Sequence, residues 1–147
     1  QDCLNLKIFV GVKDATANLD RVDQQKQKMG NEFIQLSGED GSALEFNQRG
    51  GQGCISVTAN VAPKLCSEFQ EASLSKNNDN LLSRAKEINE KLKPLHKALF
   101  IESSPSPVKY AASLLKLSSE DVRLPLVKVK QESKKIIKEA MAYASLI

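Results

Sequence analysis

The feature that most constrains this fold is a threefold alternation of apolar strand, polar turn and amphipathic helix within residues 1–74. Residues 6–12 (LKIFVGV) are almost continuously apolar, as in a strand buried on both faces. Further strands are predicted over 32–38 and 53–58, and helices over about 19–29, 42–51 and 60–74. Strands alternating with helices at this spacing predict parallel βαβ units.

Residues 75–147 have a purely helical pattern instead. After a polar loop at 75–80, apolar side chains recur every three or four positions from Leu81 to Leu99. Pro107 can open a second helix, and a stripe from Ile136 to Ala144 predicts a third. Pro125 disfavours helix in the connection at 122–129. We therefore expect two parts, 1–74 with three βα units and 75–147 as a helical C-terminal subdomain.

Three βα units do not make a complete parallel sheet. Such a sheet needs both faces covered, and an open edge strand invites pairing with another chain. A TIM barrel has eight βα units in roughly 250 residues. The predicted fold class is therefore α/β: the last three βα units of a TIM (β/α)8 barrel, followed by the helical subdomain.

Composition argues against several classes of function. The chain has one histidine and three cysteines, Cys3, Cys54 and Cys66, without a C-x-x-C pair, so we predict no metal site and three reduced thiols. It has no tryptophan and no aromatic residues interleaved with a basic stripe, so we expect no nucleic-acid partner. No long apolar run or signal-like start is present, so we expect no membrane partner and a cytoplasmic location.

Lys13 is the residue that most strongly suggests chemistry. It ends an apolar run, and strand alternation places Gly11 and Lys13 on one face and Val10 and Val12 on the other. In a TIM barrel, the C-terminal ends of the strands carry the active site. Apolar walls there would favour the neutral amine, which can attack a carbonyl and form a Schiff base. The alternative is that Lys13 marks where the strand reaches solvent.

Five stretches resemble the dihydrodipicolinate synthase family in order and spacing: VGVKDAT, LSGED, GGQGCISVTANVAPKL, PLHKALFIESSPSPVKYA and VRLPLVKV. The likeness runs from about Leu4 to Ile147. The first stretch is shared with the wider pyruvate-dependent class I aldolases, which include N-acetylneuraminate lyase. GCISVTANVAPKL and PLHKALF point more specifically to the synthases. The resemblance implies a TIM barrel with a helical C-terminal extension.

The resemblance also implies roles for three residues. Lys13 matches the lysine that forms an imine with pyruvate, Ile55 matches the position whose backbone contacts bound pyruvate, and Gly38 matches a small residue lining the pocket. The implied reaction condenses pyruvate with L-aspartate 4-semialdehyde, on the route to lysine and diaminopimelate, without metal or organic cofactor. Members of the family commonly form homotetramers.

Simpler structural roles compete with some of these assignments. Gly38 could serve a turn that needs a positive φ, and Ile55 is expected to be a core strand residue that offers only its backbone. We expect His96, within PLHKALF, to be structural or on the surface. Turn and capping roles are expected for the acidic residues Asp14, Glu39 and Asp40.

This sequence also lacks much of what the family has. The first five of the eight βα units are missing, and with them the proton-relay tyrosine, its neighbouring threonine and the arginine that holds the second substrate. Tyr110 and Tyr143 lie in the helical tail. We therefore expect weak catalysis from the chain alone and an exposed apolar edge on its first strand. Alternatives are another pyruvate-dependent aldolase such as N-acetylneuraminate lyase, or a non-catalytic remnant or interaction module; a complementary N-terminal half is a possible partner.

Overall fold

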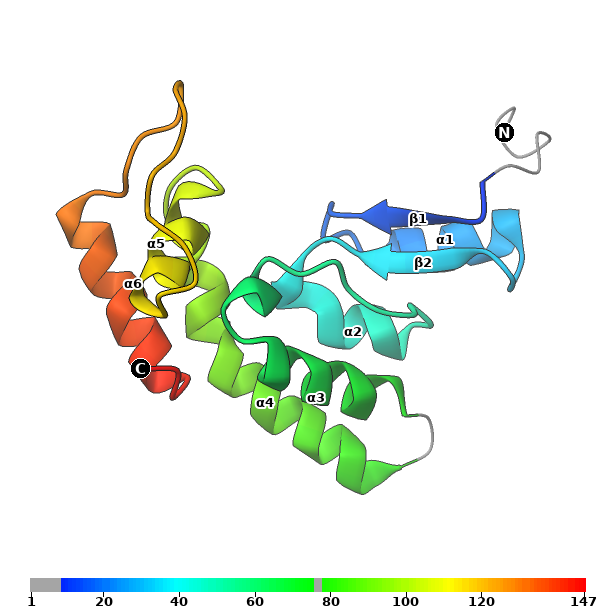
Figure 1. Ribbon diagram of the computed structural model, residues 1–147. Helices are drawn as coiled ribbons and strands as arrows, with labels where there is room; N and C mark the ends of the chain where they lie inside the picture. The colour runs from blue at the N-terminus through cyan, green and yellow to red at the C-terminus, as the bar shows by residue number, and fades with distance from the viewer. Residues whose placement is uncertain (1–8, 76–77) are drawn as a thin grey trace.

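The computed structural model describes residues 9–75 and 78–147. Three parts of the sequence discussed above lie outside these ranges: Cys3, residues 6–8 of the first predicted strand, and residues 76–77 of the predicted polar loop. The strands and α1 lie at one end of the molecule, α5 and α6 lie at the other, and α4 runs between them (Figure 1). The elements are β1 (Gly11–Asp14), α1 (Asp20–Met29), β2 (Ile34–Ser37), η2 (Asp40–Ser42), α2 (Ala43–Gln48), η3 (Thr58–Asn60), α3 (Pro63–Leu74), α4 (Asp79–Ala98), α5 (Ser106–Leu114) and α6 (Gln131–Tyr143).

Two of the three predicted strands form a parallel pair. β1 and β2 pair with Gly11 opposite Ile34 and Lys13 opposite Leu36. The prediction of a third strand over 53–58 is wrong. In this stretch only Cys54 forms a bridge, to Ser37, and the chain then turns into η3. The carboxylate of Asp40 draws the chain away, because it takes the Val57 and Thr58 N–H groups that a strand would use for pairing.

The predicted helix boundaries agree with the structure to within a few residues. Leu19 is the N-cap residue of α1, and the Asn18 side chain next to it accepts a hydrogen bond from the Asp20 N–H at 3.2 Å. Gly30 ends the helix with φ of 85° and ψ of 175°, a positive φ but not a left-handed helical conformation. Pro63 is the first residue of α3, as expected for a residue without an N–H group.

The hydrophobic core lies between α3, α4 and α6. α4 packs against α3 on one side and α6 on the other. Its predicted apolar stripe is confirmed, with five side chains that are at most 2% exposed: Ala85, Ile88, Leu92, Leu95 and Leu99. Full burial of a leucine or isoleucine is worth about 1.5–3 kcal/mol, so this stripe fixes α4 in place. Within the described ranges, no helix combines the length and apolar character needed to cross a membrane.

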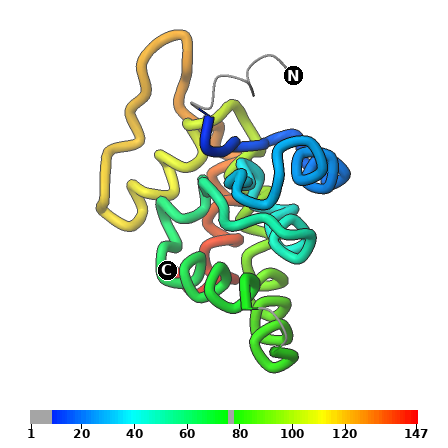
Figure 2. Tube along the Cα trace, turned by 90° about the vertical axis from the view of Figure 1, so that its right-hand side faces the viewer, coloured from blue at the N-terminus to red at the C-terminus, as the bar shows by residue number. Residues whose placement is uncertain are grey.

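Among the described residues, helices cover the strands on one side. α1 and α2 both lie to the same side of β1 and β2 (Figure 2). Phe9 is 53% exposed and Val10 72%, and Ile34 on β2 is 41% exposed. The expected exposure of apolar residues at the first strand is therefore confirmed for the described part of that strand.

Candidate active site

Lys13 stands at the carboxyl end of β1, one residue before the strand ends. Its side chain is exposed. The described residues therefore do not supply the apolar walls that the Schiff-base hypothesis expects around this amine. In this chain, Lys13 lies where the strand reaches solvent.

Gly38 follows the last residue of β2 and lies against Lys13. Its N–H donates to the Asp14 carbonyl oxygen at 2.7 Å. A Cβ built on Gly38 would lie 2.8 Å from the Cε of Lys13 and 2.7 Å from the Cβ of Ala15, closer than real contacts of this kind. The alternative of a positive φ is wrong, since the glycines with positive φ are Gly30, Gly50 and Gly53. Close approach, and not backbone conformation, is the reason for a glycine here.

Ile55 joins the same strand ends through its backbone. Its N–H donates to the Ser37 carbonyl oxygen at 2.8 Å, next to Gly38. The expectation of a core strand residue is wrong, because Ile55 lies outside the strands and is 49% exposed. Its side chain is left uncovered because the pairing stops at Cys54. Lys13, Gly38 and Ile55 therefore stand at the ends of three adjacent chain segments.

Asp14 holds the turn that follows Lys13. Its carboxylate accepts hydrogen bonds from the Thr16 N–H at 2.9 Å, from Arg21 Nε at 2.5 Å and from Gln25 Nε2 at 3.1 Å. Burial raises the pKa of Asp14, but the hydrogen bonds from Arg21 and Thr16 outweigh it and lower the pKa to about 2. The predicted turn role is confirmed. The partners Arg21 and Gln25 were missed, because nothing in the sequence distinguishes them from other polar residues of α1.

Glu39 holds the start of η2, and Asp40 holds residues 56–58. Glu39 caps η2 by accepting the Gly41 and Ser42 N–H groups at 3.0 and 2.6 Å. The buried Asp40 carboxylate accepts the Val57 N–H at 2.9 Å, the Thr58 N–H at 3.2 Å and the Ser56 hydroxyl. The capping role expected for this pair is confirmed.

His96 connects this region to α4. It is 8% exposed, and its Nδ1 lies 2.7 Å from the Thr58 hydroxyl. Burial lowers the pKa of His96, although the nearby Asp40 and Glu39 oppose the shift. The structural role expected for His96 is confirmed. Its partner Thr58, fully buried, could not be chosen from the sequence because the two residues are 38 positions apart.

A cavity of about 340 Å³ lies next to this network. Its lining includes Asp40, Cys54, Ser56, Cys66 and His96. Cys54 and Cys66 are free thiols, as expected, whereas Cys3 lies outside the described residues. Burial raises the pKa of Cys54 to about 12 and of Cys66 to about 11. Within the described ranges, no cluster of three or more His, Cys, Asp or Glu side chains could hold a metal ion.

Comparison with known proteins gives one consistent answer. The sequence profile of the Dihydrodipicolinate synthetase family matches residues 2–144. A 4-hydroxy-tetrahydrodipicolinate synthase from Pelagibacter ubique is 61% identical over 142 residues, covering 97% of this chain and 48% of that protein. The dihydrodipicolinate synthase structure from Thermotoga maritima matches with a TM-score of 0.89 and 33% identity, over 98% of this chain and 48% of the other.

A third similar protein was solved with a bound small molecule. The Acinetobacter baumannii dihydrodipicolinate synthase, complexed with pyruvate, matches with a TM-score of 0.86 and 36% identity, over 94% of this chain and 46% of its own. The chain thus spans about half the length of the curated relatives it matches. Its fold corresponds to about half of the synthase structures. Because the family profile covers nearly every residue, this chain belongs to the dihydrodipicolinate synthetase family.

Proposed function

We propose that this chain is the C-terminal half of a 4-hydroxy-tetrahydrodipicolinate synthase, comprising the last three βα units of its TIM barrel and its helical subdomain. The single observation that carries the proposal is the meeting of Lys13 and Gly38 at the ends of parallel β1 and β2, with Lys13 Cε 2.8 Å from the point where a Gly38 Cβ would stand. The carboxyl ends of barrel strands are where such enzymes keep their active sites. The 61% identity to a synthase over 97% of the chain supports the same substrates.

The proposed chemistry begins at the Lys13 amine. Its nitrogen attacks C2 of pyruvate, water leaves, and an imine forms between Lys13 and that carbon. Loss of a proton from C3 gives an enamine, and C3 then attacks the aldehyde carbon of L-aspartate 4-semialdehyde, whose oxygen takes up a proton. The imine at C2 is restored by this step, and its hydrolysis by water frees Lys13. The backbone at Ile55 and at Gly38 would hold the pyruvate moiety during these steps.

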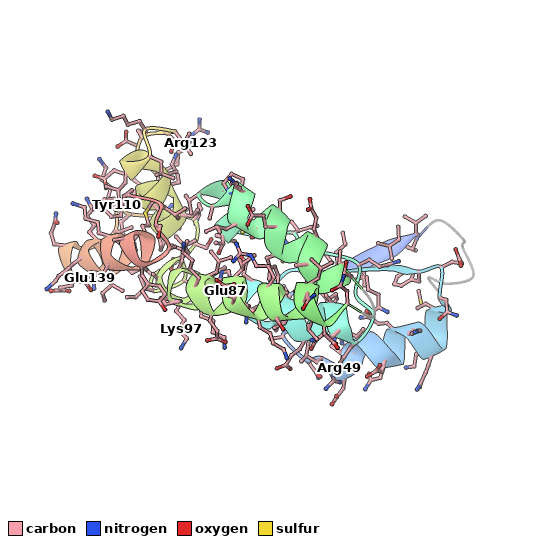
Figure 3. All side chains as sticks on the ribbon, turned by 90° about the horizontal axis from the view of Figure 1, so that it is seen from below. Arg49, Glu87, Lys97, Tyr110, Arg123 and Glu139 are labelled. Atoms are coloured by element: carbon pink, nitrogen blue, oxygen red, sulfur yellow. The ribbon has the colours of Figure 1, made fainter. Side chains whose placement is uncertain are left out.

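Neither tyrosine of this chain is placed to transfer protons at Lys13. Tyr110 lies beneath Lys134, whose Nζ is 4.8 Å from the ring centroid, and Tyr143 belongs to α6. Tyr110 thus lies among the helices at the opposite end from the strands (Figure 3). General acid–base catalysis typically contributes about 10²–10⁴-fold. We therefore propose that the chain reacts with pyruvate but condenses it poorly unless an N-terminal half supplies the proton relay.

The exposed first strand favours a complementary half over a self-sufficient module. Phe9 and Val10 are 53% and 72% exposed, and an open parallel edge of this kind favours pairing with another strand. The proposed partner is an N-terminal half-barrel, whose last strand would pair with β1. The homotetramer expected of the family would then form from the joined halves.

Borohydride trapping tests the proposed function. The purified chain is incubated with pyruvate and reduced, and the modified residue is identified by peptide mass spectrometry. We expect a reduced pyruvate adduct on Lys13 that is lost in Lys13→Arg. The matched control is Lys97→Arg, which alters an exposed lysine on α4 (Figure 3) and should keep the adduct.

Two further results would decide the outcome. An adduct spread over many lysines, or one that persists in Lys13→Arg, would contradict the assignment of Lys13. Mixing the chain with the N-terminal half of a relative should then raise condensation with L-aspartate 4-semialdehyde by about 10²-fold or more, the scale of general acid–base catalysis. Adduct formation without any such gain would favour the remnant over the synthase half.

A further inference from the structure

The segment around Ile55 lacks the support of a regular strand. Ile55 has one backbone bond to β2, from its N–H to the Ser37 carbonyl oxygen, and pairing in the sheet stops at Cys54. An irregular backbone can hold a small ligand only if other groups fix its position. In this chain, residues 55–58 are fixed from two sides, by Asp40 and by His96.

Asp40 fixes the segment from the side of β2. Its carboxylate takes the N–H groups of Val57 and Thr58 and the hydroxyl of Ser56. The Ser56 hydroxyl oxygen in turn accepts the Ala59 N–H at 2.9 Å. Asp40 is 7% exposed, so these hydrogen bonds lie largely out of water, where they hold their geometry well.

His96 fixes the same segment from the helical half. Its Nδ1 and the Thr58 hydroxyl are 2.7 Å apart, and Thr58 is completely buried. His96 stands on the same helix as Ile88, Leu92 and Leu95, which are at most 2% exposed, so the imidazole is carried by a firmly packed element. Thr58 is therefore the point at which the helical half contacts the polar network below Ile55.

We propose that His96 and Thr58 are positioning residues, which hold the Ile55 backbone where the proposed site binds pyruvate. The inference rests on the proposed function, since Ile55 matters only if pyruvate binds there. The proposal makes α4 part of the framework of the site. Through His96, α4 gives residues 55–58 a second support besides Asp40, whereas strand pairing with β2 ends at Cys54. Removing this support would weaken pyruvate binding more than it would slow the chemistry at Lys13.

Substitutions at Thr58 test the proposal with little change in volume. Thr58→Val removes the hydroxyl, and Thr58→Ser keeps it. The measurement is the pyruvate concentration that gives half of the maximal borohydride adduct on Lys13. We expect Thr58→Val to raise this concentration about tenfold, the scale of one buried hydrogen bond, with the adduct at saturating pyruvate little changed. Thr58→Ser should stay within about twofold of wild type on that scale.

Two additional variants distinguish positioning from general loss of stability. Ile88→Val shortens a buried side chain of α4 that is 2% exposed, and should lower stability without changing the half-maximal concentration. His96→Asn keeps a polar group near the position of Nδ1 and should bind pyruvate better than His96→Leu. An equal shift in Ile88→Val, or no difference between the Val and Ser variants at Thr58, would overturn the proposal.

A second measurement does not depend on the proposed function. In Thr58→Val, amide hydrogen exchange followed by NMR should become faster at positions 55, 57 and 58, and remain unchanged at Val22 in α1. If wild type formed no adduct, the proposed function would fail, while faster exchange would still support the positioning of the segment. Unchanged exchange at these three amides would overturn the positioning role whether or not an imine forms.

Discussion

Arg21 Nε donates to Asp14 Oδ2 at 2.5 Å, linking the first turn of α1 to the residue that follows Lys13. Asp14 is 8% exposed, and its backbone carbonyl also accepts the Gly38 N–H. One residue thus joins β1, α1 and the end of β2. The position of Lys13 depends on this junction as much as on the strand.

The Asp14–Arg21 pair should make stability depend on pH. Asp14→Asn keeps the shape but removes the charge, and should cost about 2 kcal/mol near pH 6. Because the folded-state pKa of Asp14, about 2, lies below its ordinary value of 3.8, the stabilisation is complete well above pH 3.8. It is lost as pH falls through the folded-state pKa. Urea unfolding of wild type and Asp14→Asn between pH 6 and pH 2 measures the difference.

The matched control for that experiment is Asp20→Asn. Asp20 also pairs with an arginine, Arg49 at 2.9 Å, but its side chain is 76% exposed, and exposed pairs contribute about 0–1 kcal/mol. A loss in Asp20→Asn as large as that in Asp14→Asn would contradict the assignment. So would an Asp14→Asn deficit that stays constant down to pH 2.

Gly38→Ala should displace the Lys13 side chain. The added Cβ would lie 2.8 Å from Lys13 Cε and 2.7 Å from Ala15 Cβ, so at least one neighbour must move. We expect about tenfold slower pyruvate adduct formation, equivalent to roughly 1.4 kcal/mol, measured by timed borohydride quenching. In Gly41→Ala, a few residues along the chain, the atoms nearest the added Cβ belong to Glu39, at 3.1 Å and beyond, and not to Lys13. An equal effect in both variants would argue against steric displacement of Lys13.

Val10→Lys should reduce self-association of the chain. Val10 is 72% exposed beside β1, and a lysine on an edge strand opposes pairing with another chain. Light scattering across a concentration series should show a smaller mean mass than for wild type. Leu124→Lys, at a position 87% exposed outside the helices and strands, is the control. If only the Leu124 change reduced the mass, the strand edge would not be the contact.

Cys54 and Cys66 should resist alkylation in the folded chain. With pKa values of about 12 and about 11 against an ordinary 9.0, their thiolate fractions near pH 8 fall by about 10³ and 10². Iodoacetamide labelling, with each peptide quantified by mass spectrometry, should be slow for both until urea is added. Rapid labelling of Cys66 in the folded chain would show that the cavity opens more readily than its burial indicates.

Local sequence pattern predicted most of the helical architecture. The spacing of Ala85, Ile88 and Leu92 identified the buried face of α4, because burial repeats with the period of the helix. The local pattern failed at 53–58, where apolar residues predict a strand. There the Asp40 carboxylate competes for the backbone N–H groups of Val57 and Thr58. That competition depends on a residue 17 and 18 positions away, which no local window contains. The division of the chain at residue 75 stays a prediction.

The candidate site was only partly predictable for the same reason. Resemblance to the family selected Lys13, Gly38 and Ile55, but not the contacts that hold them. The exposure of Ile55, 49%, was missed because a strand-like pattern carries no information about whether a second face is covered. The Thr58–His96 contact depends on how α4 docks, and docking is decided by tertiary packing.

The Thr58–His96 contact also gives the chain an intrinsic spectroscopic reporter. His96 is the sole histidine in the sequence, so its imidazole proton signals are identified without isotope labelling or substitution. Because that ring lies against the segment next to Ile55, a change in its chemical shift on adding pyruvate would report events at the strand ends. The same signal, followed while an N-terminal half is titrated in, would register assembly of the barrel in real time.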